Sequence, residues 1–137
     1  MDRPGMEILL VEDNAGDAVL IRQVLAEGSV PVNLHIARDG EQALALLDGE
    51  DFRPTLIILD LNIPRIPGVS LLERWRTNDI PVVVFTSSQI AAEKTRVLAL
   101  GAREFIEKPT DIAAFIRALR GIVERWSGDN KGAALGA

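Results

Sequence analysis

The stretch LIILD at residues 56–60 is an apolar run that ends at a carboxylate, and three more segments of the chain follow the same plan. They are ILLV at 8–11 before Glu12-Asp13, VVVF at 82–85 before Thr86-Ser87-Ser88, and FI at 105–106 shortly before Lys108-Pro109. Short runs that are rich in Val and Ile and do not alternate with polar residues are typical of strands buried on both faces, as in a parallel sheet. Function collects at the carboxyl ends of the strands in such a sheet, so we expect these polar residues to meet at one edge.

The composition is that of a single globular domain whose partners are proteins. The chain has 137 residues, 47% of them hydrophobic and 26% charged, and its net charge is −5. An acidic chain is poorly suited to a phosphate backbone, so we expect no nucleic-acid partner. The sequence holds no cysteine and one histidine, which excludes disulfides, thiolate catalysis and metal sites built from Cys or from several His.

No apolar stretch approaches the roughly 20 residues that a membrane span needs. The first five residues, MDRPG, lack the apolar core of a signal peptide. We therefore expect a cytoplasmic protein without a membrane partner.

Strand-like and helix-like segments alternate along the chain. The spacing of apolar residues predicts helices near 14–27, 41–47, 69–77, 90–100 and 112–126, and an edge strand at 32–37. Asn14 and either Ser87 or Ser88 are of the residue types that cap helix N-termini. Five strand–helix units predict an α/β fold of the flavodoxin-like type, a doubly wound five-stranded parallel sheet in the order 2-1-3-4-5 within a three-layer sandwich. We expect this domain to span residues 6–127 and the small, polar remainder, 128–137, to be a disordered tail.

Three carboxylates, those of Glu12, Asp13 and Asp60, stand at the ends of two strands that are neighbours in this order. A single acid at a strand end is most often a helix cap or a solvated loop residue. Two unit charges about 4 Å apart, however, repel each other by roughly 4 kcal/mol at an effective dielectric of about 20. The cluster therefore indicates a bound cation or a raised pKa, and its oxygen ligands favour Mg²⁺.

Two further side chains are expected at the same edge. Lysine is usually a solvated surface residue, but Pro109 restricts the backbone of Lys108 at the end of the sheet. A fixed ammonium beside a metal–carboxylate site can clamp a phosphate. Thr86 could cap the next helix, but Ser87 and Ser88 are better placed to do so, which leaves the Thr86 hydroxyl to donate to a phosphoryl oxygen.

Four motifs occur together in one order and at one spacing: Glu12-Asp13, DLNIP at 60–64 with Gly68, Thr86-Ser87, and Lys108-Pro109. With this combination the chain resembles the CheY-like receiver domains of two-component response regulators, from about residue 6 to residue 126. VEDN at 11–14 with Asp17, and DLNIPR at 60–65, look most like the small single-domain regulators paired with phytochrome-type histidine kinases. Pro67 stands where the family often has Asp, which alters the loop but removes no ligand.

The resemblance implies that Asp60 accepts a phosphoryl group from a kinase phosphohistidine. It also implies Mg²⁺ as the cofactor, with Asp13 and Asp60 as direct ligands, Asn62 as a ligand through its backbone carbonyl, and Glu12 as a ligand through water. Mg²⁺-dependent self-phosphorylation and autodephosphorylation would be the chain's own chemistry, so we expect a phosphoacceptor switch and not an enzyme.

The same resemblance implies that Lys108 and Thr86 each bind a phosphoryl oxygen, with help from the backbone amide of Ser87. Phe105 takes the place of the family's switch aromatic, although plain core packing explains this residue equally well. Because Phe105 has no hydroxyl, any switching there would work by ring packing. The resemblance further implies a cis peptide bond between Lys108 and Pro109.

We expect a stand-alone receiver of a phosphorelay that signals by phosphorylation-dependent protein binding. A sensor histidine kinase would act upstream, and an unidentified protein would bind downstream. The helix 90–100, the strand 105–106 and the helix 112–126 form the expected output surface.

A symmetric homodimer through that surface is a further expectation. The last helix carries a longer apolar series than one sheet contact needs and ends in Trp126, while Ile90, Val97 or Leu98 could be partly exposed beside it. A Trp126 that folds back over its own domain explains the sequence nearly as well.

Three other functions fit the pattern less well. A phosphatase of the haloacid-dehalogenase type also uses an Asp nucleophile, but it needs an acid two residues later, where Asn62 cannot transfer a proton. A flavodoxin-like carrier would place its phosphate beside the acidic Glu12-Asp13 loop. A receiver-like adaptor that is never phosphorylated would not need the complete set of acids, Thr86 and Lys108.

Overall fold

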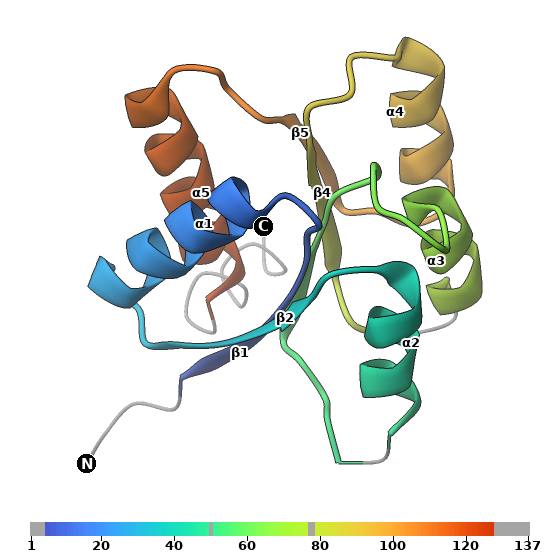
Figure 1. Ribbon diagram of the computed structural model, residues 1–137, viewed down its shortest axis with the longest axis horizontal. Helices are drawn as coiled ribbons and strands as arrows, with labels where there is room; N and C mark the ends of the chain where they lie inside the picture. The colour runs from blue at the N-terminus through green and yellow to red at the C-terminus, as the bar shows by residue number, and fades with distance from the viewer. Residues whose placement is uncertain (1–4, 50, 77–78, 128–137) are drawn as a thin grey trace, which may run out of the picture.

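The computed structural model describes residues 5–49, 51–76 and 79–127. The strands of this part form one sheet in which all neighbours are parallel, in the order β2-β1-β3-β4-β5 (Figure 1). They are β1 (Met6–Val11), β2 (Val32–Ala37), β3 (Leu56–Leu59), β4 (Val82–Thr86) and β5 (Glu104–Glu107). The predicted fold class and strand order are confirmed.

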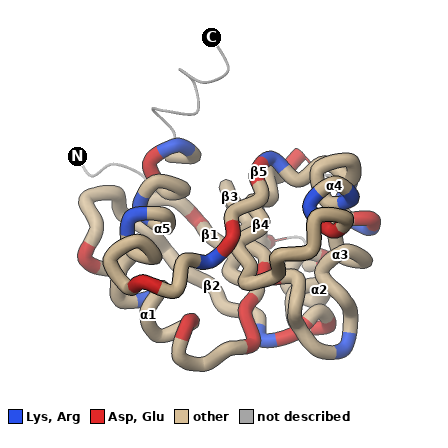
Figure 2. The backbone as a smooth tube through the Cα atoms, turned by 90° about the horizontal axis from the view of Figure 1, so that it is seen from above, with Lys and Arg blue, Asp and Glu red and all other residues tan. Residues whose placement is uncertain are grey.

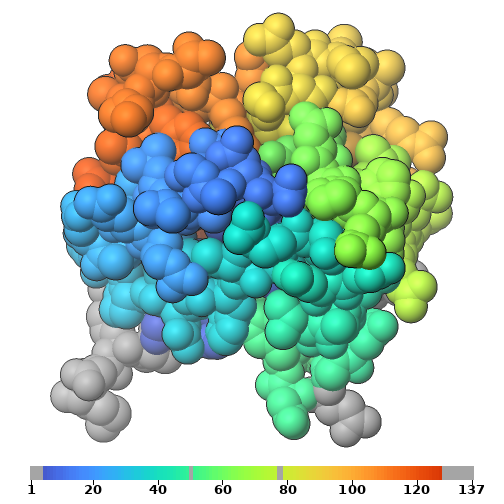
Figure 3. Space-filling view, viewed as in Figure 1, coloured from blue at the N-terminus to red at the C-terminus, as the bar shows by residue number. Residues whose placement is uncertain are grey.

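The helices of the described residues lie on both faces of the sheet, as a three-layer sandwich requires. They are α1 (Ala15–Glu27), α2 (Gly40–Asp48), α3 (Gly68–Trp75), α4 (Ala91–Ala99) and α5 (Ile112–Trp126). α1 and α5 cover one face, and α2, α3 and α4 cover the other (Figure 1). In the space-filling view, these helices and the loops around them close over the sheet (Figure 3). None of the described helices is long and apolar enough to cross a membrane.

The core consists of two apolar layers that the sheet separates. Along β1, Ile8 and Leu10 pack toward α1 and α5, whereas Leu9 and Val11 pack toward α2, α3 and α4. Successive side chains of a strand point to opposite faces, so a strand covered on both sides needs apolar residues at every position. β3 and β4 are fully buried and carry no charged residue along their length (Figure 2). The edge strand β2 is half-exposed, as its alternating sequence predicts.

Side-chain caps begin three of the helices. The side chain of Asn14 accepts a hydrogen bond from the Asp17 N–H at 2.8 Å, which confirms Asn14 as the cap of α1. Asp39 and Asp111 cap α2 and α5 in the same way. These contacts satisfy backbone N–H groups that have no partner inside the helix.

The predicted cap of α4 by Ser87 or Ser88 is wrong. The N-cap position is Ile90, which offers no side-chain acceptor. The Ser88 hydroxyl accepts a hydrogen bond from the Ile90 N–H at 3.3 Å and donates to the Glu93 carboxylate. Ser88 therefore fastens the start of α4 from two residues before its N-cap.

At the end of the loop between β3 and α3, the backbone at Gly68 lies too close to Leu61 for any side chain. A Cβ atom on Gly68 would lie 2.8 Å from the Cα of Leu61, so glycine is required there. Arg65, in the same loop, has a positive φ of 75° and contacts Asp39 across an ion pair of 3.3 Å. This tight loop fixes the backbone immediately after Asp60.

The expectation of a cis Lys108–Pro109 bond is wrong, because the described residues contain no cis peptide bond. The trans form is the more stable one for an X–Pro bond by about 0.5–1 kcal/mol, so a cis bond needs tertiary contacts that favour it. The Lys108 N–H donates to the Thr86 carbonyl at 2.7 Å and continues the pairing of β5 with β4.

The face formed by α4, β5 and α5 differs in part from its prediction. Ile90 and Leu98 are exposed, as expected, but Val97 is fully buried. The indole N–H of Trp126 donates to the Glu104 carboxylate at 2.6 Å, so Trp126 folds back over its own domain. The tail predicted for residues 128–137 lies outside the described residues.

Candidate functional site

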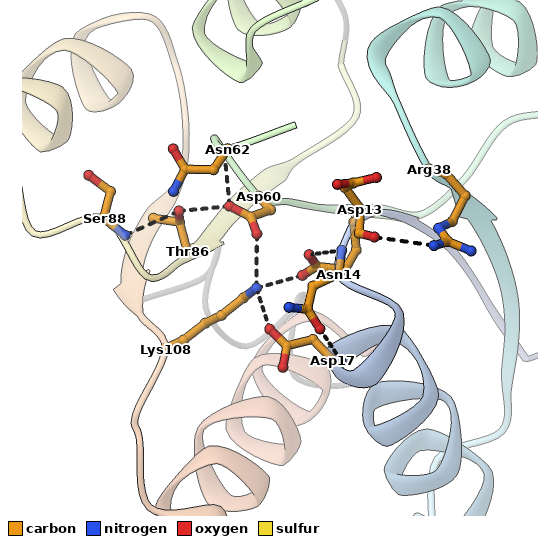
Figure 4. A network of polar contacts seen from close by, with 10 residues as sticks. Asp13, Asn14, Asp17, Arg38, Asp60, Asn62, Thr86, Ser88 and Lys108 are labelled. Atoms are coloured by element: carbon orange, nitrogen blue, oxygen red, sulfur yellow. Dashed lines mark hydrogen bonds and ion pairs between the residues drawn. The ribbon is translucent and has the colours of Figure 1, made fainter. Parts of the chain in front are cut away.

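Four of the polar residues predicted to meet lie together at the carboxyl edge of the sheet (Figure 4): Glu12, Asp60, Thr86 and Lys108. Glu12 follows β1, Asp60 follows β3, Thr86 ends β4 and Lys108 follows β5. Each of these side chains is buried, although all four are polar. Parallel pairing of β1, β3, β4 and β5 aligns the strand ends, and this alignment brings together residues that are up to 96 positions apart.

The ammonium of Lys108 lies at the centre of the site (Figure 4). Its Nζ contacts Glu12 Oε1 at 2.6 Å, Asp17 Oδ2 at 2.8 Å and Asp60 Oδ2 at 2.9 Å. An ammonium has three N–H donors, so each donor has one carboxylate partner. Burial alone would lower the pKa of Lys108, but the bonds to Asp17, Glu12 and Asp60 outweigh it and raise the pKa. Lys108 is therefore charged and held in place.

The Asp60 carboxylate receives donors on both oxygens. Oδ1 accepts from the Thr86 hydroxyl at 2.8 Å and from the Asn62 N–H at 3.0 Å, while Oδ2 accepts from Lys108. Burial would raise the pKa of Asp60, but the Asn62 N–H, the Lys108 ammonium and the Thr86 hydroxyl outweigh it and lower the pKa. Asp60 is thus an ionised carboxylate in a buried setting, with hydrogen-bond donors on both of its oxygens.

Glu12 is the most deeply buried acid of the group, with an exposed fraction of 1%. Its Oε1 binds Lys108, and its Oε2 accepts from the Asn14 N–H at 3.1 Å. Burial raises the pKa of Glu12 to about 7, and the negative charge of Asp60 contributes to this rise. The hydrogen bond from Lys108 acts in the opposite direction but is weaker than the effect of burial.

Asp13 stands apart from this cluster. Its side chain is exposed, and its backbone carbonyl accepts from the Arg38 guanidinium at 3.2 Å. In the described ranges, no group of three or more acidic, His or Cys side chains is arranged to hold a metal ion. The metal ligand set therefore stays a prediction, and Lys108 occupies the space between Glu12 and Asp60.

The donor chemistry of these residues nevertheless fits a hard divalent cation. Asp13 and Asp60 follow neighbouring parallel strands, and both offer the oxygen ligands that such ions prefer. Lys108 brings one positive charge to Glu12, Asp17 and Asp60, which carry three carboxylates between them. This imbalance leaves negative charge that a cation can neutralise.

Ser87 and Phe105 flank the site. Ser87 is exposed, whereas the next residue, Ser88, donates its N–H to the Thr86 hydroxyl oxygen at 3.4 Å. Phe105 is half-buried against the apolar layer under α2, α3 and α4. It also lines a pocket of about 260 Å³ beside the start of α4, together with Ile90. The role of Phe105 as the switch aromatic stays a prediction.

Sequence reasoning assigned no role in the site to Asp17. Its place three residues after the cap Asn14 suggests an ordinary acid in the first turn of a helix, where a negative charge interacts favourably with the helix dipole. Its contact with Lys108 joins residues 91 positions apart, so no local pattern could reveal it.

The chain matches the family model of the response regulator receiver domain over residues 8–120. Response regulator Rcp1 of Synechocystis is 33% identical over 132 residues, a match that covers 90% of each chain. The solved structure of the phosphorylated cyanobacterial phytochrome response regulator RcpA has a TM-score of 0.85 and 33% identity, covering 92% of this chain and 96% of that one. The Mn²⁺-bound form of Rcp1 has a TM-score of 0.83 and the same identity, covering 90% of this chain and 95% of that one.

Longer regulators match as well. The transcriptional regulatory protein PhoP of Escherichia coli is 32% identical over 127 residues, which is 90% of this chain and 54% of PhoP. The chain therefore spans about half the length of this relative.

Proposed function

Because the chain belongs to the response regulator receiver domain family, we propose that it is a phosphorylation-dependent switch that accepts a phosphoryl group on Asp60 from a histidine kinase. The observation that carries the proposal is the surrounding of Asp60. A buried, ionised carboxylate has the Lys108 ammonium on one oxygen and the Thr86 hydroxyl on the other. In this arrangement Asp60 would be the nucleophile, and Lys108 and Thr86 would donate hydrogen bonds to the phosphoryl group.

In the proposed transfer, an Asp60 oxygen forms a bond to phosphorus while the bond from phosphorus to the imidazole nitrogen of the kinase histidine breaks. The electron pair of the broken bond stays on that nitrogen. Lys108 turns from Asp60 Oδ2 to a phosphoryl oxygen, Thr86 donates to a second oxygen, and the Ser87 amide assists. Phosphoryl transfer asks little more of a protein than in-line positioning and neutralised charge.

We place a divalent cation, Mg²⁺ in the cell, at the same edge. Asp13, Asp60 and the Asn62 carbonyl would hold it directly and Glu12 through water, and it would neutralise charge on the transferred group. The donor chemistry supports this assignment, as does the Mn²⁺-bound form of the relative Rcp1.

The proposed output is binding to another protein. A phosphoryl group on Asp60 would take the Thr86 hydroxyl away from Oδ1, and the movement would pass to Phe105 and the start of α4. The chain would thus work as a stand-alone receiver spanning residues 6–127, and its chemistry would be limited to its own phosphorylation and dephosphorylation. A cytoplasmic location belongs to the same proposal.

A phytochrome-type kinase is the proposed upstream partner, because the similar structure RcpA is a phytochrome response regulator. A homodimer through α4, β5 and α5 is also proposed, supported by the exposed side chains of Ile90 and Leu98. Sedimentation with and without beryllofluoride tests the dimer, and a monomer in both states at high micromolar concentration would exclude it.

Intact-mass measurement after incubation with acetyl phosphate and Mg²⁺ tests the central proposal. We expect the mass of one phosphoryl group on the wild type and none on Asp60→Asn. The exposed Asp79→Asn is the matched control and should label like the wild type. Labelling of Asp60→Asn at the wild-type level would refute Asp60 as the acceptor, and an unlabelled wild type would favour an adaptor that works without phosphorylation.

A further inference from the structure

Asp17 joins helix α1 to the lysine at the centre of the site. Its carboxylate lies 2.8 Å from Lys108 Nζ, and its side chain is 32% exposed, whereas the side chains of Glu12 and Asp60 are 2% and 7% exposed. The Asp17 N–H is bound to the side chain of the cap Asn14, which fixes the helix turn that carries it (Figure 4). Asp17 is thus a partly solvated third carboxylate at the edge of a buried cluster.

The hydrogen bonds of Asp60 explain why this third partner matters. Asp60 Oδ1 is occupied by Thr86 and Asn62, and Oδ2 is occupied by Lys108. Oδ2 accepts a single bond, so it keeps a free lone pair for attack on phosphorus, and Lys108 can turn from Oδ2 to a phosphoryl oxygen. When Lys108 releases Oδ2, its two remaining bonds run to Glu12 and Asp17. These bonds decide where the ammonium waits for the phosphoryl oxygen.

We propose that Asp17 is a positioning residue for phosphoryl transfer: it holds Lys108 Nζ toward α1, and its charge weakens the attraction of the site for an anionic phosphoryl donor. This inference rests on the proposed function of Asp60. Asp17 has two separable properties, an oxygen that accepts a hydrogen bond and a negative charge. The acceptor orients Lys108, and the charge opposes the arriving group.

Two substitutions separate these properties. Asp17→Asn keeps an acceptor oxygen and removes the charge, whereas Asp17→Ala removes both. A unit charge about 6 Å away, at an effective dielectric of about 40 to 80, changes binding by about three- to tenfold. We therefore expect the acetyl phosphate concentration that gives half the maximal rate to fall by about that factor in both variants. The maximal rate should stay near wild type in Asp17→Asn and should fall about tenfold in Asp17→Ala, because Lys108 is then poorly oriented.

The control is Glu41→Gln, which removes an exposed acid from the first turn of α2, where it pairs with Arg65 and not with Lys108. Both kinetic constants of this variant should equal those of the wild type. If Asp17 merely stabilised the fold, the half-maximal concentration would not fall in both variants while the maximal rate fell only in Asp17→Ala. Unchanged constants in both Asp17 variants, or equal changes in Glu41→Gln, would overturn the proposal.

A second measurement does not depend on phosphorylation. The rate at which acetic anhydride acylates the Lys108 amine, followed by peptide mass spectrometry, reports how firmly the ammonium is held. We expect faster acylation of Lys108 in Asp17→Ala than in the wild type, with no change in Glu41→Gln. Equal rates in the Ala variant and the wild type would refute the positioning contact. Lys108 could react faster in Asp17→Ala while the wild type accepts no phosphoryl group. In that case the positioning contact between Asp17 and Lys108 is supported, but the proposed function and the effect of Asp17 on phosphoryl transfer are refuted.

Discussion

Two polar clusters lie near opposite ends of β5, and they differ in burial and in charge balance. The site cluster consists of Glu12, Asp17, Asp60 and Lys108, and the terminal cluster consists of Glu104, Arg125 and Trp126. In the terminal cluster, the Arg125 guanidinium binds the Glu104 carboxylate at 2.7 and 3.1 Å, and the Trp126 indole donates to the same carboxylate. In the site cluster, Lys108 serves three carboxylates.

The comparison shows which polar cluster is prepared for a further partner. Arg125 and Glu104 balance each other in charge, and their side chains remain partly in water, at 49% and 25% exposed. The site cluster buries more negative than positive charge, and burial strengthens every electrostatic interaction. The balanced, solvated pair holds the end of α5 to β5, whereas we expect the unbalanced, buried cluster to gain stability from a cation bound beside its carboxylates.

Removal of each cation is the sharpest way to break this comparison. Lys108→Met should lower the free energy of unfolding by about 3–5 kcal/mol, because it leaves buried carboxylates without their partner. Arg125→Met should cost less than about 1 kcal/mol, because partly solvated ion pairs contribute little. Urea unfolding at neutral pH without divalent cations measures both values. Similar losses in the two variants would show that burial does not separate the clusters.

The pH dependence of stability tests the burial of Glu12. Its pKa is about 7 in the folded chain, against an ordinary value of 4.5. A raised carboxyl pKa adds stability that is complete below the unfolded pKa and is lost as the pH rises through the folded pKa. Relative to Glu12→Gln, the wild type should therefore lose about 3 kcal/mol between about pH 4.5 and pH 7. Urea unfolding of both proteins in a chelating buffer measures this difference, with the exposed Glu41→Gln as the control.

A difference between the wild type and Glu12→Gln that stays constant over this range would contradict the raised pKa. A difference that grows in favour of the wild type as the pH rises would mean that Lys108 dominates the ionisation of Glu12.

Divalent cations should stabilise the fold through the site cluster. Mg²⁺ at a hundredfold excess over its dissociation constant should add about 2.7 kcal/mol to the free energy of unfolding. Asp13→Ala should abolish this response, whereas Asp79→Ala should keep it. Thermal unfolding across a millimolar Mg²⁺ titration measures the effect, and a melting temperature that does not move would argue against a metal site at this edge.

A small effect is also expected at Trp126, in the terminal cluster. Trp126→Phe keeps an aromatic ring but removes the hydrogen bond of 2.6 Å to Glu104, so it should cost about 1 kcal/mol. Phosphorylation by acetyl phosphate should not change, because Trp126 takes no part in the site cluster. A slower phosphorylation in this variant would mean that the two clusters are coupled through α5.

The sequence alone determined the fold and the four strand ends that form the site. Unbroken apolar runs require strands that are covered on both faces, and parallel strands in this order must bring Glu12, Asp60, Thr86 and Lys108 to one edge. These predictions rest on local patterns and on the few topologies that connect them. For the same reason, the cap Asn14 could be recognised from its place before a helix.

The tertiary structure alone decided which partners these side chains choose. The contact of Asp17 with Lys108, the bond of Trp126 to Glu104 and the full burial of Val97 depend on how separate helices pack on the sheet. The trans bond before Pro109 depends likewise on surrounding contacts that no local motif specifies. A periodic pattern states which face of an element is buried, but the distances that make a hydrogen bond arise only when elements remote in sequence come together.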